Sequence, residues 1–190
     1  WRLGFAFAAG IDPVVIATTS EYPAMLASFE DYEKPEQNTY IYDPRDIRTA
    51  FVTPRSLEKA GHIVTRTAIL GDDVMCHALK GTVGEKAMHN VLTMVRMDNQ
   101  LTSWDDLIKS PETAKVPTSA AASCLLVAKA VQRIEKDNVN AWVKYMGRIS
   151  KEAQGLFATS VMRTKKASTV GTSKEFIKWA TENNYLFARA

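Results

Sequence analysis

The feature that most constrains this sequence is the recurrence of apolar residues at helical spacing along most of its 190 residues. Apolar side chains at positions i, i+3, i+4 and i+7 share one face of an α-helix, whereas strict alternation with polar residues is typical of a strand. Alternation is nearly missing, and the best strand candidates are the short segments 39–42 and 50–52. Five segments show the helical pattern: Met88, Val91, Leu92 and Val95; Cys124, Val127, Ala128, Val131 and Ile134; Trp142, Tyr145, Met146 and Ile149; Phe157, Val161 and Met162; Phe176, Ile177 and Ala180. The sequence therefore predicts an all-α fold, an antiparallel helical bundle.

Signals for helix starts support this prediction. An N-cap side chain precedes a proline at Asp12-Pro13, Asp43-Pro44 and Thr53-Pro54, and proline is well tolerated at the first helical position because its missing N–H would be unpaired there anyway. Ser103 with Asp106, and Thr172 with Glu175, have the spacing of a capping box. We expect about eight helices.

One stretch interrupts the helical pattern. Residues 28–54 contain three prolines and many charges but no long apolar face, which is typical of a functional loop. Pro111 and Pro117 bracket a short connector, and a further helix is expected to begin near Thr118. We therefore expect a helical domain over residues 1–117, with an irregular loop at 28–54, and a C-terminal helical extension over residues 118–190 that packs on it.

Composition excludes several classes of protein. The apolar fraction of 46% argues against disorder, and no apolar run approaches the roughly 20 residues needed to cross a bilayer. A net charge of +3 gives no strong reason to propose a nucleic-acid or membrane surface. Two cysteines inside apolar runs predict buried, reduced thiols in a cytoplasmic protein. Because the first residue is Trp1, we also expect the chain to begin within a longer polypeptide.

Arg55 is the sharpest candidate for a functional residue. It follows the Thr53 cap and Pro54, which places it in the first turn of a helix, where a cation gains nothing from the positive end of the helix dipole. An external anion would explain an arginine at this position, and the planar guanidinium can bind two phosphate oxygens at once. The alternative is a surface arginine paired with Glu58 or with an aspartate of the loop.

The residues around Arg55 resemble a known family. Residues 53–59 resemble the sensor-2 segment of MoxR-like AAA+ ATPases, which include phage and bacterial ATP-binding proteins. In that family a Pro-Arg pair opens a helix of the lid, and its arginine reaches the γ-phosphate of the nucleotide. Three other segments resemble the family in the same order: residues 1–14 its helix leaving the nucleotide-binding core, residues 79–87 its G-x-V-G helix junction, and residues 107–117 its short helix and proline connector.

The resemblance implies an AAA+ lid-like fold with extra C-terminal helices, in which Arg55, supported by Thr53 and Pro54, senses bound ATP. It also implies ATP and Mg²⁺ as cofactors of the intact protein, a ring of identical subunits, and a von Willebrand A-type partner. Leu57 departs from the family, which often has tryptophan there. The sequence contains no G-x-x-x-x-G-K-[ST] motif and no strand ending in paired acids, so we expect no catalytic residue and no ATP hydrolysis without the missing nucleotide-binding core.

Other motifs favour structural roles. Gly81 and Gly84 predict a tight turn between helices, since no strand precedes them and Glu85 follows. Cys76 and His77 lack the spacing of a zinc site; we expect Cys76 in the core and His77 at the surface. The acid pairs 72–73 and 105–106 are expected to open helices.

Two alternative functions remain open at this stage. One is a helical protein–protein interaction module without a nucleotide role, in which Arg55 is structural. The other is a helical DNA-binding domain that uses the basic residues 163–166 together with Lys174 and Lys178. We favour a solvated helix end for that cluster, because cations are stabilised beside the exposed carbonyls of a helix C-terminus.

Overall fold

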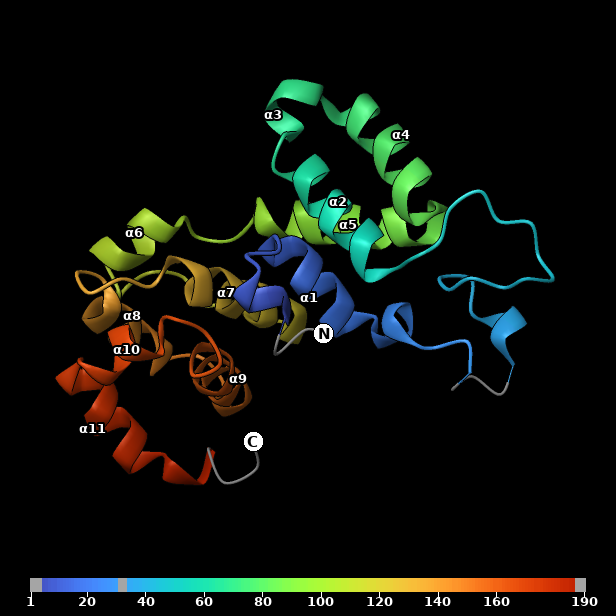
Figure 1. Cartoon of the computed structure of the whole chain (residues 1–190). Helices are drawn as coiled ribbons and strands as arrows, with labels where there is room; N and C mark the ends of the chain where they lie inside the picture. Colours follow the sequence, from blue (N-terminus) through green and yellow to red (C-terminus); the bar gives the residue numbers. More distant parts are fainter. Residues whose placement is uncertain (1–4, 31–33, 187–190) are drawn as a thin grey trace. The chain divides into compact units, whose positions relative to one another are not determined.

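The computed structural model describes residues 5–30 and 34–186, and these residues fold into helices joined by turns and loops (Figure 1). The described residues contain eleven α-helices and no strand, which confirms the all-α prediction. The α-helices are α1 (Pro13–Glu21), α2 (Pro54–Val64), α3 (Thr67–Leu70), α4 (Asp72–Val83), α5 (Glu85–Asp98), α6 (Trp104–Lys109), α7 (Ala120–Arg133), α8 (Val139–Met146), α9 (Lys151–Val161), α10 (Ala167–Gly171) and α11 (Lys174–Glu182). Short 3₁₀ turns are η2 (Pro23–Leu26), η3 (Pro35–Gln37) and η4 (Asn184–Leu186).

Both strand predictions are wrong. Residues 39–42 form turns, and residues 50–52 have no regular structure. A single backbone hydrogen bond joins the two segments, from Val52 N–H to the Tyr40 carbonyl oxygen at 2.6 Å. Tyr40, Ile41 and Val52 are nevertheless buried. One bond does not make a ladder, so the segments stay irregular.

Three of the predicted helix starts are correct. Asp12 and Thr53 cap α1 and α2, each with proline at the first position, and Ser103 caps α6. The prediction at Asp43-Pro44 is wrong: Asp43 instead caps a turn by accepting the Arg45 N–H at 3.0 Å. The charged residues after Pro44 offer no face to bury, so no helix propagates from this cap.

The Thr172–Glu175 capping box is also wrong, by one residue. Thr172 ends α10, and Ser173 caps α11 by accepting the Phe176 N–H at 3.0 Å. Ser173 is the buried hydroxyl of the two, and it also donates to Asn140 Oδ1 at 2.9 Å. This second partner comes from another helix, which the local sequence does not reveal.

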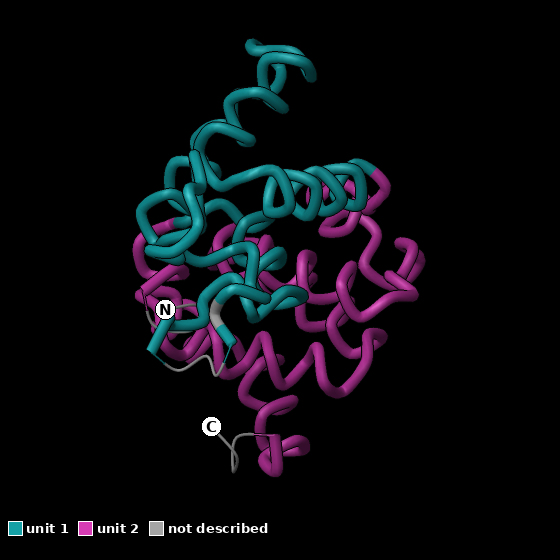
Figure 2. Tube along the Cα trace, turned by 90° about the vertical axis from the view of Figure 1, so that its right-hand side faces the viewer, with its two compact units in different colours: residues 1, 11–99 teal, residues 2–10, 100–190 magenta. Residues whose placement is uncertain are grey.

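The chain divides into two compact units (Figure 2). Among the described residues, unit 1 contains residues 11–30 and 34–99, and unit 2 contains residues 5–10 and 100–186. The division into a helical domain over residues 1–117 and a C-terminal extension over residues 118–190 stays a prediction. Residues 1–14 are the segment predicted to resemble the helix that leaves the nucleotide-binding core. Residues 1–4 lie outside the described residues. The rest of the segment is interrupted at Gly10, whose φ is +68°, before α1 begins.

Unit 1 is built around α1, which contacts α2, α5 and η2, while α4 contacts α2, α3 and α5. Its core is aliphatic and sulfur-rich. The most deeply buried side chains include Ile16, Met25, Leu57, Leu79 and Met94. The described residues between η2 and α2 also belong to this unit.

Unit 2 is built around a chain of aromatic rings. Trp142 of α8 lies at 5.7 Å from Trp104, 5.8 Å from Tyr145 and 5.2 Å from Phe157, between ring centroids. Phe176 continues the chain to Trp179. The helix α7 packs against α9 and is buried almost all round, which a one-sided apolar pattern does not predict.

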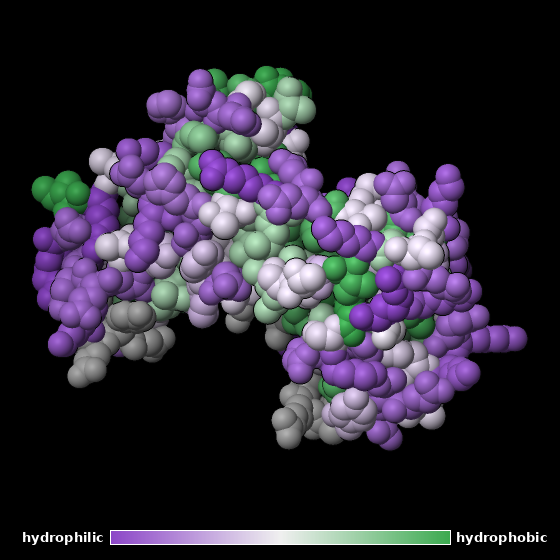
Figure 3. Space-filling model, turned by 180° about the vertical axis from the view of Figure 1, so that it is seen from behind, coloured by the Kyte–Doolittle hydropathy of each residue, from purple (hydrophilic) through white to green (hydrophobic). Residues whose placement is uncertain are grey.

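Several predicted core positions are more exposed than the patterns indicate. Met162 and Ile177 are half exposed, and Leu92, Val95 and Cys76 are only partly buried. In α5 the buried stripe runs instead through Ala87, Met88, Val91 and Met94, because the helix is rotated so that Met94 faces the core. The prediction that His77 is exposed is confirmed. Most of the face shown in Figure 3 is hydrophilic, with apolar residues interspersed.

Candidate functional site

The start of α2 is a well-capped helix end. Thr53 Oγ1 accepts the Ser56 N–H at 3.0 Å, and Ser56 Oγ accepts the Thr53 N–H at 2.8 Å, so the two residues form a reciprocal capping box. Pro54 has no N–H to satisfy. The capping predicted at Thr53-Pro54 is therefore present, and it leaves the N–H of Arg55 as the remaining donor of the first turn.

Arg55 projects from this turn as an exposed side chain. Within the described ranges it forms no ion pair or hydrogen bond through its guanidinium, so the alternative pairing with Glu58 or a loop aspartate is not seen. Lys59 is also exposed, and it lies one turn further along the same face of α2. Two cations thus stand near the positive end of one helix without a neutralising carboxylate.

Both cations line a hollow in unit 1 with a volume of about 330 Å³. Its other walls are the loop residues Thr49, Ala50 and Phe51, the cap residues Thr53 and Ser56, and the C-terminal end of α4 at Gly81 and Thr82. No Asp or Glu is among these lining residues. The hollow therefore has the charge and donors to bind an anion at the N-terminus of a helix.

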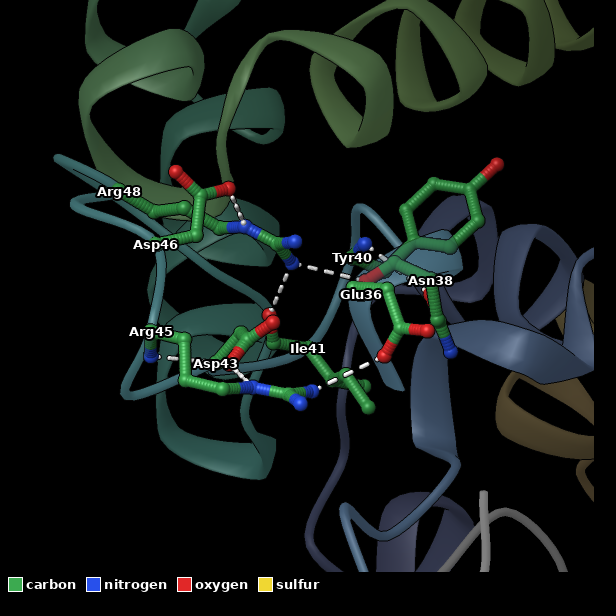
Figure 4. A network of polar contacts seen from close by, with 8 residues as sticks. All are labelled: Glu36, Asn38, Tyr40, Ile41, Asp43, Arg45, Asp46 and Arg48. Atoms are coloured by element: carbon green, nitrogen blue, oxygen red, sulfur yellow. Dashed lines mark hydrogen bonds and ion pairs between the residues drawn. The ribbon is translucent and has the colours of Figure 1, made fainter. Parts of the chain in front are cut away.

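The wall at residues 49–51 is held by a network of charged residues in the preceding loop (Figure 4). Arg48 Nη1 donates to the carbonyl oxygens of Asn38 at 2.8 Å and Ile41 at 2.6 Å, and Arg48 Nε donates to Asp46 at 2.8 Å. Arg45 bridges the Asp43 and Glu36 carboxylates. These bonds fold the loop back on itself just before the wall begins.

Asp43 is the electrostatic centre of this network. Its side chain is only 1% exposed, and the pKa of its carboxyl lies below the ordinary value of 3.8, first because the Arg45 backbone N–H donates to it and also because the Arg45 and Arg48 guanidinium groups are close. The same contacts raise the pKa of Arg45. These contacts favour the charged form of the carboxylate.

Tyr40 fastens the loop to α5. Its hydroxyl accepts from Asn90 Nδ2 at 2.7 Å, and Lys86 Nζ lies 4.7 Å from its ring centroid. At the other end of the wall, a Cβ placed on Gly84 would be 3.0 Å from the Ala50 carbonyl oxygen, and Gly84 has a φ of +85°. Glycine at this α4–α5 turn thus lets the loop approach closely. The predicted tight turn is present at Gly84, whereas Gly81 lies inside α4 and is not part of it.

The remaining sequence candidates are not among the residues that line this hollow. The acid pairs 72–73 and 105–106 occupy the first turns of α4 and α6, as predicted. The basic residues 163–166 belong to unit 2. No group of three or more His, Cys, Asp or Glu side chains in the described part of the chain is arranged to hold a metal ion. The sequence predicts a role for Arg55 but not for Lys59, which also lines the hollow. The one signal for Lys59 in the sequence is its position four residues after Arg55, which places both side chains on one face of the helix.

Of the helices in the described ranges, none is both long enough and apolar enough to cross a membrane. Comparison with known proteins gives no family: no family model, no curated protein and no solved structure matches this chain.

Proposed function

We propose that this chain is the lid part of a MoxR-like AAA+ ATPase and that Arg55 senses the γ-phosphate of bound ATP. The main support for the proposal is a pair of exposed cations, Arg55 and Lys59, in a hollow at the positive end of α2. No carboxylate lines this hollow. Such an arrangement is unfavourable for the helix alone, since cations repel the dipole there, and it becomes favourable when an anion enters.

The donors suit a terminal phosphate. The Arg55 guanidinium can offer two parallel N–H groups, Lys59 adds a point charge, and the Arg55 backbone N–H points along the helix axis. The capping box keeps the first turn of α2 rigid, so contact with phosphate would move the helix as one body. In this proposal α2 transmits the nucleotide state to the rest of an antiparallel, lid-like bundle.

The hydrolysis itself belongs to a separate nucleotide-binding core with a P-loop and Mg²⁺, because these 190 residues have no phosphate cradle. Rings of identical subunits and a von Willebrand A-type partner are further parts of the proposal, supported by the resemblance of residues 53–59 and the segments in order around it. The proposal requires a P-loop core in the intact protein; an intact protein without one would remove the ATPase proposal.

The decisive experiment is Arg55→Ala in the protein that joins this chain to its core. ATP turnover should fall about 10²-fold or more, because a charge-stabilising donor to the reacting phosphate is lost. The matched control is Arg96→Ala, since Arg96 is also an exposed arginine of unit 1 but lies on α5 outside the hollow. Equal turnover in the Arg55 variant and the control would favour the interaction module without a nucleotide role.

A binding measurement on the 190-residue chain separates sensing from turnover. Titration with inorganic triphosphate should shift the amide NMR signals of Arg55, Lys59 and Thr82, and Arg55→Ala should remove these shifts while leaving the rest of the spectrum intact. Shifts of equal size in the wild-type chain and the Arg55→Ala variant would contradict the assignment of the hollow.

A further inference from the structure

A second hollow, in unit 2, gathers the basic residues that follow α9. Its volume is about 580 Å³. One side is formed by Phe7, Ala8 and Gly10 and another by the last turn of α7 at Val131 and Gln132. The third side is residues 163–166, which the sequence alone placed at a solvated helix end.

The basic side of this hollow has a fixed backbone. Arg163 N–H donates to the Ser160 carbonyl at 3.2 Å, and the N–H and Oγ1 of Thr164 donate to the Val161 carbonyl at 3.0 and 2.8 Å. Thr164 Oγ1 then accepts the Lys166 N–H at 3.1 Å. These turns use the last carbonyls of α9 internally, so those oxygens do not face the hollow as free acceptors.

The charges in the hollow are only partly balanced. Lys166 Nζ pairs with Glu135, which ties the loop to the chain just beyond α7. Arg163 and Lys165 are exposed, and neither side chain has an ion-pair partner among residues 5–30 and 34–186. No Asp or Glu lines the hollow, so it carries two unneutralised positive charges.

The hollow also has an apolar floor. Phe7 and Val131 line it and are buried, 8% and 1% exposed, beside the cations. The helix dipole of α9 explains why basic residues occur near its end, but it does not explain their convergence on a concave site with apolar residues. A few placed polar groups beside apolar side chains, at this volume, are the usual features of a small-molecule site.

We propose that this hollow binds a small phosphorylated organic molecule, with its phosphate on Arg163 and Lys165 and its apolar part against Phe7 and Val131. A phosphomonoester carries close to two negative charges, which matches the two unpaired cations. Concavity favours a compact ligand over duplex DNA, whose phosphates follow an extended backbone. Lys174 and Lys178, which would extend a DNA surface, lie on α11 and do not line the hollow. The proposal does not depend on the role of Arg55.

Phenyl phosphate is a suitable probe, because it combines a phosphomonoester with one apolar ring. Titrated into the 190-residue chain at low salt, it should shift the amide NMR signals of residues 163–166 together with Ala8 and Gly10. Phenol and inorganic phosphate, which each carry half of the recognised chemistry, should bind at least tenfold more weakly.

Two variants of equal charge change test the assignment. Arg163→Ala should weaken phenyl phosphate binding about tenfold or more, since a charge-assisted hydrogen bond is lost. Lys178→Ala removes one positive charge outside the hollow and should leave the affinity within twofold. Equal weakening by both variants, or an absence of shifts at Ala8 and Gly10, would overturn the site. Retention of duplex DNA through Arg163 without phenyl phosphate binding would overturn it in favour of a nucleic-acid surface.

Discussion

The two units of this chain are stabilised by different kinds of interaction. Unit 2 has a continuous chain of aromatic rings around Trp142, whereas unit 1 combines an aliphatic core with a polar loop that is held by Arg48 and Asp43. Burial of large rings stabilises by removing apolar area from water, while a loop network depends on particular donors and acceptors. Unit 2 is therefore organised around a packed aromatic core, whereas unit 1 also uses polar contacts to fix a loop at its surface.

The largest effect is expected from Trp142→Ala in unit 2. Loss of the most central ring should cost about 3–5 kcal/mol of unfolding free energy, because the cavity cannot collapse fully between three neighbouring rings. Hydrogen exchange measured by mass spectrometry should accelerate in α7, α8 and α9 before α2 and α4. Uniform acceleration in both units would show instead that they unfold as one.

Trp142→Phe is the matched control. Trp142 Nε1 is buried and has no hydrogen-bond partner in the part of the chain that the structure describes. Phenylalanine keeps an aromatic ring and removes this unsatisfied donor, so the loss of packing is offset in part. We expect the phenylalanine variant to lose less than half of the stability that the alanine variant loses.

An intermediate effect is expected in unit 1 from Gly84→Ala. The added Cβ would meet the Ala50 carbonyl oxygen at 3.0 Å, at a φ of +85°, and should cost about 1–3 kcal/mol. Gly81→Ala, inside α4, meets nothing within 4 Å and should instead stabilise by up to about 1 kcal/mol. Urea unfolding of both variants measures the difference, and equal midpoints would refute the close approach of the loop.

The smallest effect is the pH response of the loop. The pKa of Asp43 is lower in the folded chain than its ordinary value of 3.8, so its contribution to stability is present above that value and is lost as the pH falls through the folded pKa. The Asp43 carboxyl carbon should therefore titrate with a midpoint below 3.8 in NMR spectra. Between pH 5 and 7 the loop amides should not change. A midpoint above the ordinary value would remove Asp43 from the centre of the network.

The sequence predicts local features of unit 1 better than tertiary ones. Thr53-Pro54 and Asp43-Pro44 look alike as dipeptides, yet only Thr53-Pro54 opens a helix, because Leu57 and Ala60 then provide a face to bury. Within residues 45–50, which follow Asp43-Pro44, the only large apolar residue is Ile47, and it is fully exposed. A helix cap can be predicted from a few neighbouring residues. Whether a helix continues beyond the cap depends on whether the rest of the chain buries one of its faces.

The same limit applies to the candidate site. Arg55 could be predicted because its place in the first turn is a local property. The wall at Thr49–Phe51 and Thr82 could not, since their proximity depends on Gly84 and on the bond between Val52 and Tyr40. Both are contacts between segments that are separated along the chain, and the spacing of apolar residues in the sequence does not predict such contacts.

The bond from Val52 to Tyr40 has a consequence for how this region can change over evolution. It closes residues 40–52 into a lobe whose two ends are already side by side, and Arg48 fastens the lobe from within. Lengthening a loop whose ends are fixed costs little, because closure entropy grows only with the logarithm of loop length. Ile47, at 100% exposure, marks the place on the lobe where extra residues would disturb nothing that is packed. Homologous chains can therefore differ in length at this point and still present the same start of α2.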